Sequence, residues 1–300
     1  MACEHPLIMV DITCGRAVKR ILRQGFKFAP NYKALVEQFG IQNTFVIPCG
    51  KCDSCKMAYR RMWSLRAEAE ARLYKDNCFV TLTMDNDNVT KEVSKEHLQK
   101  FFRALRDKGY KFRYFACGEY GRHPMTGDRE RPHYHAILFG FIPSDIKPWA
   151  KSKKGFWQFT SNILSDIWQK GFVTIMMFDP SCAGYVAGYV DKKESEEDGF
   201  LMMSTRPGLG YDYYRQHMEE LAEFDSFISK GGFKSVLPRY FEKAASDAWF
   251  DITDLKIKRM QKTSELSIGT AQSHGFEHME EIFKYQGDKE RRKKKNARNL

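Results

Sequence analysis

The stretch RPHYHAILFG, Arg131–Gly140, predicts a β-strand that opens with two histidines. Residues two apart in a strand project from the same face, so His133 and His135 present two adjacent imidazoles. Apolar residues then fill both faces of the run, which is typical of a central strand covered on both sides. The polar start of the strand either chelates a divalent cation or consists of structural histidines that bond to loop carbonyls.

Hydrophobic patterning around this strand predicts an α+β domain. The predicted elements are, in chain order, a strand at 77–84, a helix at 94–109, strands at 111–121 and 133–141, a helix at 161–171, a strand at 172–178 and a helix at 179–193. Gly109 ends the first helix, and Asp179 with Pro180 begins the last one. This order predicts a ferredoxin-like antiparallel or mixed sheet with helices on its face.

The composition indicates a folded chain with a polyanionic partner. The 300 residues are 42% hydrophobic and carry a formal net charge of +11. The tail 289–298 holds seven basic residues and one acidic residue, so it supplies +6 of that charge, and we expect it to be disordered. We find no apolar run long enough for a bilayer and no secretory signal pattern, so we expect no membrane association and a reducing cytoplasm.

Three of the eight cysteines stand in the motif CGKCDSC at 49–55. In a reducing compartment, Cys49, Cys52 and Cys55 at this spacing favour a structural zinc site over disulfides. A tetrahedral site needs a fourth ligand, for which we choose Cys3, with Cys14 or His5 as alternatives. An iron–sulfur cluster or simple burial of the thiols are the other interpretations.

A second candidate site is the stretch GYVAGYVDKK, residues 184–193. Tyr185 and Tyr189 are four apart and so lie on one face of the predicted helix, with glycines beside them at the same spacing. A tyrosine hydroxyl can attack phosphorus when a metal polarises the phosphate and another group takes the proton. The alternative is a pair of tyrosines that pack on the sheet.

These motifs together resemble the HUH-type rolling-circle replication initiators, most closely those of small circular single-stranded DNA phages of the microvirus and gokushovirus kind. The resemblance rests on three ordered blocks, FVTLTMD, RPHYHAILF and YVAGYVDKK, and extends outward to CGKCDSCK, ACGEYG, RPGLGYD and LPRYFEK. It covers most of the chain.

The resemblance implies an HUH endonuclease fold and a metal-dependent tyrosine nuclease. His133 and His135 would hold Mg²⁺ or Mn²⁺, and Tyr185 and Tyr189 would attack a DNA phosphodiester to give a 5′-phosphotyrosine and a free 3′-OH. The implied segments are a cysteine-rich N-terminal part with a basic helix at 1–76, the nuclease core at 77–193, a helical or irregular extension at 194–288 and the basic tail at 289–300.

Several further residues complete the predicted site. Two imidazoles need an oxygen ligand to favour Mg²⁺ or Mn²⁺, and Glu119 is the first candidate, with Asp85 as the alternative. Relatives often carry a basic residue immediately before the second tyrosine, where this chain has Gly188, so Lys192 and Lys193 are expected to substitute. The predicted phosphate-binding residues are Arg60, Arg61, Arg66 and Arg131.

The expected function is site-specific nicking and religation of a phage origin during rolling-circle replication. The partners would be single-stranded or supercoiled origin DNA and the helicase and polymerase machinery of a bacterial host, in whose cytoplasm the protein would act. A plasmid initiator, relaxase or HUH transposase would use the same chemistry. A non-enzymatic zinc-containing DNA-binding protein is the alternative of another class.

Overall fold

A computed structural model describes the chain at residues 3, 7–10, 37, 44–90, 92–122, 129–152, 155–188, 199–275, 281, 285, 288–289 and 292. The chain divides into two compact units, residues 1–59 with 256–300 and residues 60–255. The first unit contains the antiparallel pair β1 (Leu7–Val10) and β2 (Thr44–Ile47), and most of the helix α9 (Thr253–His274). Helix α2 (Asp53–Ala71) has residues in both units.

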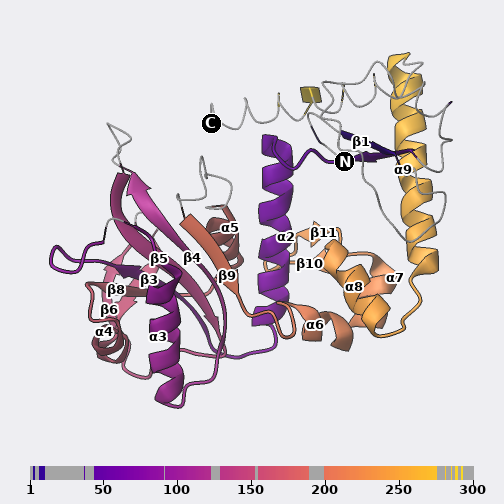
Figure 1. Ribbon diagram of the computed structural model, residues 1–300. Helices are drawn as coiled ribbons and strands as arrows, with labels where there is room; N and C mark the ends of the chain where they lie inside the picture. Colours follow the sequence, from indigo (N-terminus) through magenta and orange to yellow (C-terminus); the bar gives the residue numbers. More distant parts are fainter. Residues whose placement is uncertain are drawn as a thin grey trace. The chain divides into compact units, whose positions relative to one another are not determined.

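The second unit is built on a seven-stranded antiparallel sheet in the order β6-β7-β8-β3-β5-β4-β9 (Figure 1). Its strands are β3 (Asn77–Thr83), β4 (Arg113–Arg122), β5 (Arg129–Phe139), β6 (Lys147–Lys151), β7 (Trp157–Thr160), β8 (Val173–Met177) and β9 (Gly199–Met203). The predicted α+β class and antiparallel sheet are confirmed. The strand with the two histidines, β5, lies inside the sheet between β3 and β4.

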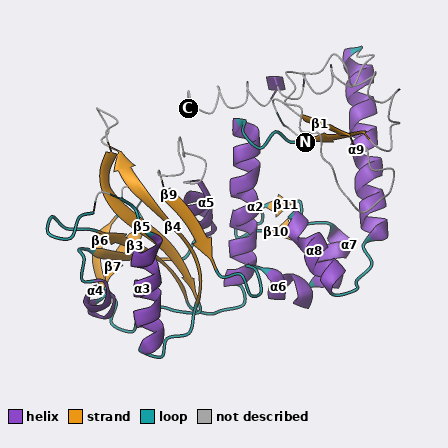
Figure 2. Cartoon of the chain, in the orientation of Figure 1, coloured by secondary structure: helices purple, strands orange, loops and turns teal. Residues whose placement is uncertain are grey.

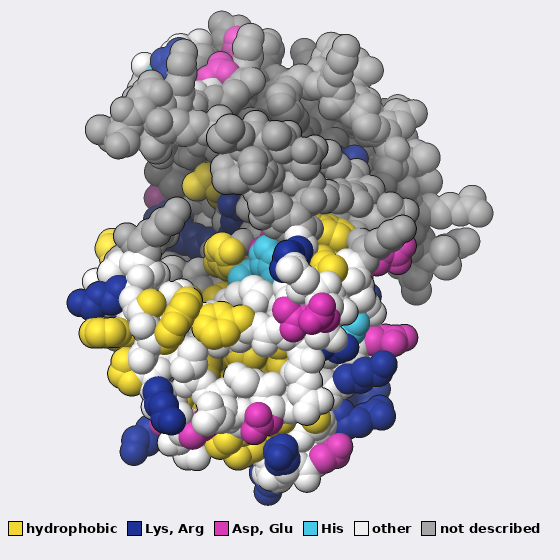
Figure 3. Space-filling view, turned by 90° about the vertical axis from the view of Figure 1, so that its left-hand side faces the viewer, with side chains coloured by type: hydrophobic (Ala, Val, Ile, Leu, Met, Phe, Trp, Pro, Cys, Tyr) yellow, Lys and Arg dark blue, Asp and Glu magenta, His cyan; other side chains and the backbone are white. Residues whose placement is uncertain are grey.

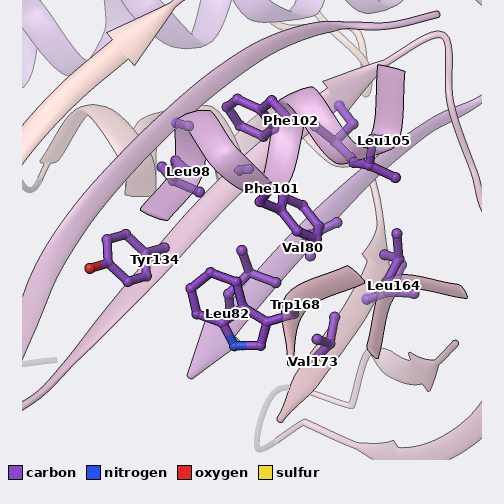
Figure 4. Close-up of a cluster of buried hydrophobic side chains, with 14 of the residues drawn as sticks. Val80, Leu82, Leu98, Phe101, Phe102, Leu105, Tyr134, Leu164, Trp168 and Val173 are labelled. Carbon is purple, nitrogen blue, oxygen red and sulfur yellow. The ribbon is translucent and has the colours of Figure 1, made fainter. Parts of the chain in front are cut away.

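Helices α3 (Lys95–Asp107) and α4 (Asn162–Trp168) cover one face of this sheet. Ser94 and Ser161 cap them by accepting backbone N–H groups of their first turns. Their buried apolar side chains pack on alternate residues of β3, β5 and β8, as the close-up in Figure 4 shows. Each large side chain buried here contributes roughly 1.5–3 kcal/mol. The sheet is therefore held rigid beneath its other face.

The opposite face carries α5 (Pro180–Gly188) and residues 60–71 of α2. Two glycines of α5 lie against α2: a Cβ at Gly184 would lie 3.0 Å from Ser64 Oγ, and one at Gly188 would lie 3.1 Å from Arg60 Nε. A larger side chain at either position would therefore press on α2. This close contact explains why a helix that helps to form the site contains two residues of low helix propensity.

The C-terminal part of this unit packs on α2 around a second apolar cluster. It consists of α6 (Tyr211–Gln216), α7 (Met218–Phe224), α8 (Arg239–Asp247) and the hairpin of β10 (Phe227–Ile228) with β11 (Lys234–Ser235), all visible in Figure 2. The sequence did not predict this arrangement, nor the strands β6, β7 and β9. The predicted segment boundaries at 76, 193 and 288 stay a prediction. Among the described helices, none is long and apolar enough to cross a membrane.

Candidate functional site

Three side chains from neighbouring strands converge where β4 and β5 pair. The antiparallel register places Glu119 directly opposite His133 and Cys117 opposite His135. One carboxylate oxygen, Glu119 Oε1, lies 2.9 Å from His133 Nε2 and 3.1 Å from His135 Nε2. The structure thus brings together the two predicted histidines and the first-choice carboxylate.

The outer nitrogens of the two imidazoles have partners of their own. His133 Nδ1 lies 3.2 Å from the Arg131 carbonyl, which can only accept, so Nδ1 carries the proton and Nε2 presents its lone pair to the cluster. His135 Nδ1 lies 3.0 Å from Thr81 Oγ1. Such outer contacts orient imidazoles that ligate a metal.

The charge of Glu119 is stabilised within this buried cluster. Burial raises the pKa of its carboxyl, but hydrogen bonds to His133 and His135 outweigh burial and hold that pKa below its usual range. One anionic oxygen and two imidazole nitrogens lie within 4.8 Å of one another, which is a donor set that fits one divalent cation. The alternative ligand, Asp85, instead accepts both from the backbone N–H and from the side-chain amide of Asn88, at 2.9 Å.

Helix α5 places Tyr185 beside this cluster. The Tyr185 ring lies edge-on to that of His135, with centroids 5.0 Å apart, and also contacts Phe79. Its side chain is 46% exposed, so the ring is accessible from solvent although it borders a buried cluster. The other predicted catalytic residues, Tyr189, Lys192 and Lys193, lie outside the described residues.

The four predicted DNA-binding arginines lie in different environments. Arg60 donates to the Gly188 carbonyl at 3.4 Å, and Arg61 donates to Ser235 Oγ at 3.0 Å. The exposed Arg131 donates to the Met84 carbonyl and to the Asn86 side chain.

Arg66 differs from the other three because it is buried. Its guanidinium lies 4.2 Å from the ring centroid of Trp63 and 3.6 Å from that of Tyr240, and it donates to the Leu209 carbonyl. Cation–π contacts of this kind are worth more when they are desolvated. This environment favours a structural role for Arg66 over the predicted DNA contact.

The first unit contains a cluster of four cysteines. The Sγ atoms of Cys3, Cys49, Cys52 and Cys55 all lie within 4.8 Å of one another, so the structure selects Cys3 as the partner of the CGKCDSC motif. The alternatives Cys14 and His5 lie outside the described residues. Burial raises the pKa of Cys49, but backbone N–H donors at Cys52 and Lys51 outweigh it and lower that pKa to about 7. Four clustered thiols, one of which ionises readily, fit a structural metal.

Comparisons with known proteins agree with the resemblance inferred from the motifs. Residues 77–194 match the family model of the replication-associated protein ORF2. The chain is 29% identical to replication-associated protein ORF2 of Spiroplasma virus 4 over 84% of this chain and 82% of that protein. It is 25% identical to replication-associated protein VP4 of Bdellovibrio phage phiMH2K, over 81% of this chain and 82% of that protein. A third relative is replication-associated protein ORF4 of Chlamydia phage 1, 28% identical over 67% of this chain and 54% of that protein. No solved structure matches.

Proposed function

Because residues 77–194 are a domain of the replication-associated protein ORF2 family, we propose that this phage replication protein is an HUH-type, metal-dependent endonuclease and strand transferase. It would nick single-stranded origin DNA through a 5′-phosphotyrosine and later religate the product during rolling-circle replication of a phage genome. We propose that it acts in the cytoplasm of the bacterial host together with the host helicase and polymerase.

The observation that carries this proposal is the position of a phenol beside a three-ligand cluster. Glu119, His133 and His135 form the donor set, and the Tyr185 ring packs against that of His135. A strand-borne cluster with an exposed tyrosine at its edge needs only a phosphodiester between them to react. The other described four-residue cluster, the cysteines, has thiolate ligands, which Mg²⁺ and Mn²⁺ do not prefer.

The chemistry requires a nucleophile, charge stabilisation and a leaving group. A divalent cation held by Glu119, His133 and His135 would neutralise charge on the scissile phosphate. The Tyr185 oxygen forms a bond to phosphorus while the bond to the 3′-oxygen breaks, and the phenolic proton is lost as the 3′-oxygen gains one. One phosphodiester replaces another, so the step is reversible. The second tyrosine, Tyr189, can then cut a regenerated origin.

Positive charge beside the tyrosines would come from a different element than in many relatives. Gly188 stands where they carry a basic residue, and the guanidinium of Arg60 from α2 lies against that glycine. We propose that Arg60, together with Lys192 and Lys193, offsets the charge of the DNA near the nucleophiles. Arg131, two residues before His133 on β5, would bind the neighbouring phosphate.

A gel assay tests the enzymatic proposal directly. The protein is incubated with oligonucleotides that tile the single-stranded genome, in Mn²⁺ or in EDTA, and is run on a denaturing gel. We expect a metal-dependent covalent adduct with a subset of tiles and a new free 3′-OH end. Absence of an adduct with every tile, with and without metal, would leave the non-enzymatic zinc-containing DNA-binding protein as the better description.

The cysteine cluster leads to a separate prediction, that it binds structural zinc. We expect about one zinc per chain by elemental analysis, and expect Cys52→Ser to lose most of that zinc on dialysis and to melt at a lower temperature, because a structural metal contributes folding free energy. The matched control is Cys182→Ser, on α5 and outside the cluster, which should keep its zinc. Iron with a visible charge-transfer band would instead identify an iron–sulfur cluster, and wild-type protein without any bound metal would refute the site.

A further inference from the structure

An exposed aromatic pair lies at the far side of the sheet from β9. Trp149 on β6 and Phe172, just before β8, have ring centroids 4.8 Å apart, and their side chains are 55% and 44% exposed. Large aromatic side chains in contact with each other usually lie in a core, where burial stabilises them. A solvent-facing pair of this kind calls for a ligand with a flat apolar surface.

The strand register places this pair in line with the metal-ligand cluster. Glu119 on β4 lies opposite His133 on β5, and His133 lies opposite Thr83 on β3. Thr83 in turn receives the next contact, because its backbone N–H donates to the Phe172 carbonyl at 2.9 Å. Residues opposite one another on neighbouring strands share a face. Phe172 therefore lies on the same face as the histidines, two strand spacings or about 10 Å from His133.

The same face also carries positive charge. Lys147 stands two residues before Trp149 on β6 and is exposed, and Arg131 stands two residues before His133 on β5 and is exposed. Figure 3 shows hydrophobic side chains gathered on the surface beside a histidine, with Lys and Arg side chains around them. A row of aromatic rings flanked by cations matches the needs of a single strand, whose bases stack and whose phosphates are anionic.

We propose that Trp149 and Phe172 form a base-stacking platform for single-stranded DNA that leads to the metal-ligand cluster. This inference rests on the proposed function, since the cluster gives the strand its scissile end. Stacked nucleotides advance about 3.4 Å per step, so a span of about 10 Å places the stacked base two or three nucleotides from the scissile phosphate. The platform would hold unpaired bases and reject a duplex, whose bases are already stacked on one another.

The test measures binding and chemistry separately. Anisotropy of labelled single-stranded and duplex forms of one origin oligonucleotide is measured in EDTA, and adduct formation is measured in Mn²⁺. We expect Trp149→Ala/Phe172→Ala to bind the single strand roughly tenfold to 100-fold more weakly, in line with the loss of base–aromatic stacking, with little change for duplex. Its adduct yield should fall at low DNA concentration and recover at saturation. Trp149→Phe, which keeps an aromatic ring, should restore most of the affinity.

The matched control is Trp249→Ala, which removes a tryptophan that is 96% exposed and lies beyond α8. It should leave single-strand binding unchanged. Equal single-strand affinity for wild type and the double variant would overturn the platform, and so would an equal loss with Trp249→Ala. If affinity depends on Trp149 but wild type forms no adduct, the nuclease proposal fails and the platform stands. A variant that changes oligomeric state without changing DNA affinity would make the pair a protein interface and refute the inference.

Discussion

We expect the variant Tyr185→Phe/Tyr189→Phe to form no covalent adduct with single-stranded origin DNA. Phenylalanine keeps the ring that packs against His135 and Phe79 but lacks the oxygen that attacks phosphorus. Loss of a covalent nucleophile lowers turnover by up to about 10⁶-fold in other enzymes, so the adduct should fall below detection. Each single variant should keep part of the nicking, because the remaining tyrosine can act. A denaturing gel of labelled oligonucleotide checks all three variants.

A matched control is Tyr110→Phe, which removes a hydroxyl from a ring that packs on Phe141, on the opposite face of the sheet. It should keep wild-type activity. Full activity of the double tyrosine variant would refute the assignment of both residues. Loss of activity in Tyr185→Phe alone would instead make that residue, the one beside the metal-ligand cluster, responsible for the first cut.

The second large effect concerns the metal-ligand cluster. We expect His135→Ala and Glu119→Gln each to weaken Mn²⁺ binding by at least about 100-fold, because a change even in the residues around metal ligands commonly costs 10–100-fold. Adduct formation at low Mn²⁺ should then fall by roughly 1,000-fold, since charge stabilisation by the metal contributes several kcal/mol to such reactions. Calorimetric titration with Mn²⁺ and the adduct assay over a range of metal concentrations measure the two effects.

Asp85→Asn is the control for this prediction, because it removes the alternative carboxylate. Asp85 is exposed and already bonds to Asn88, so its loss should change Mn²⁺ affinity by less than about twofold. If Asp85→Asn abolishes metal binding and Glu119→Gln does not, the third ligand is Asp85. Melting curves should accompany each variant, since Glu119 and His135 are buried and their replacement can also lower stability.

The metal-ligand cluster could be predicted from sequence because its geometry is local to two adjacent strands. Two histidines two residues apart must share a face, and a short connection between consecutive strands favours their pairing. Glu119 then needs only the correct register to lie opposite His133. The choice of Cys3 had a different basis, the number of ligands that a tetrahedral metal requires, and the structure places Cys3 with the triplet.

Other features depend on residues that are distant in the chain, and the sequence pattern did not contain them. Arg66 belongs to a helix whose basic residues look solvent-exposed, but Tyr240 comes from α8 to cover its guanidinium. Strands β6 and β7 are short, and KPWAK contains a proline, which weakens any strand prediction. The Trp149 and Phe172 pair could therefore not be recognised before the sheet order was known.

The contact between α5 and α2 also bears on how this protein could be engineered. A thermostability screen would first replace the glycines of α5 by alanine, a change that usually stabilises a helix by about 1 kcal/mol per position. Here a methyl group at Gly184 or Gly188 meets Ser64 or Arg60 at close range, and α5 would have to shift together with Tyr185. Such variants would gain heat resistance and lose catalytic alignment, which is a common conflict between stability and activity. Stabilising changes are better sought on α3, whose exposed face lies on the other side of the sheet.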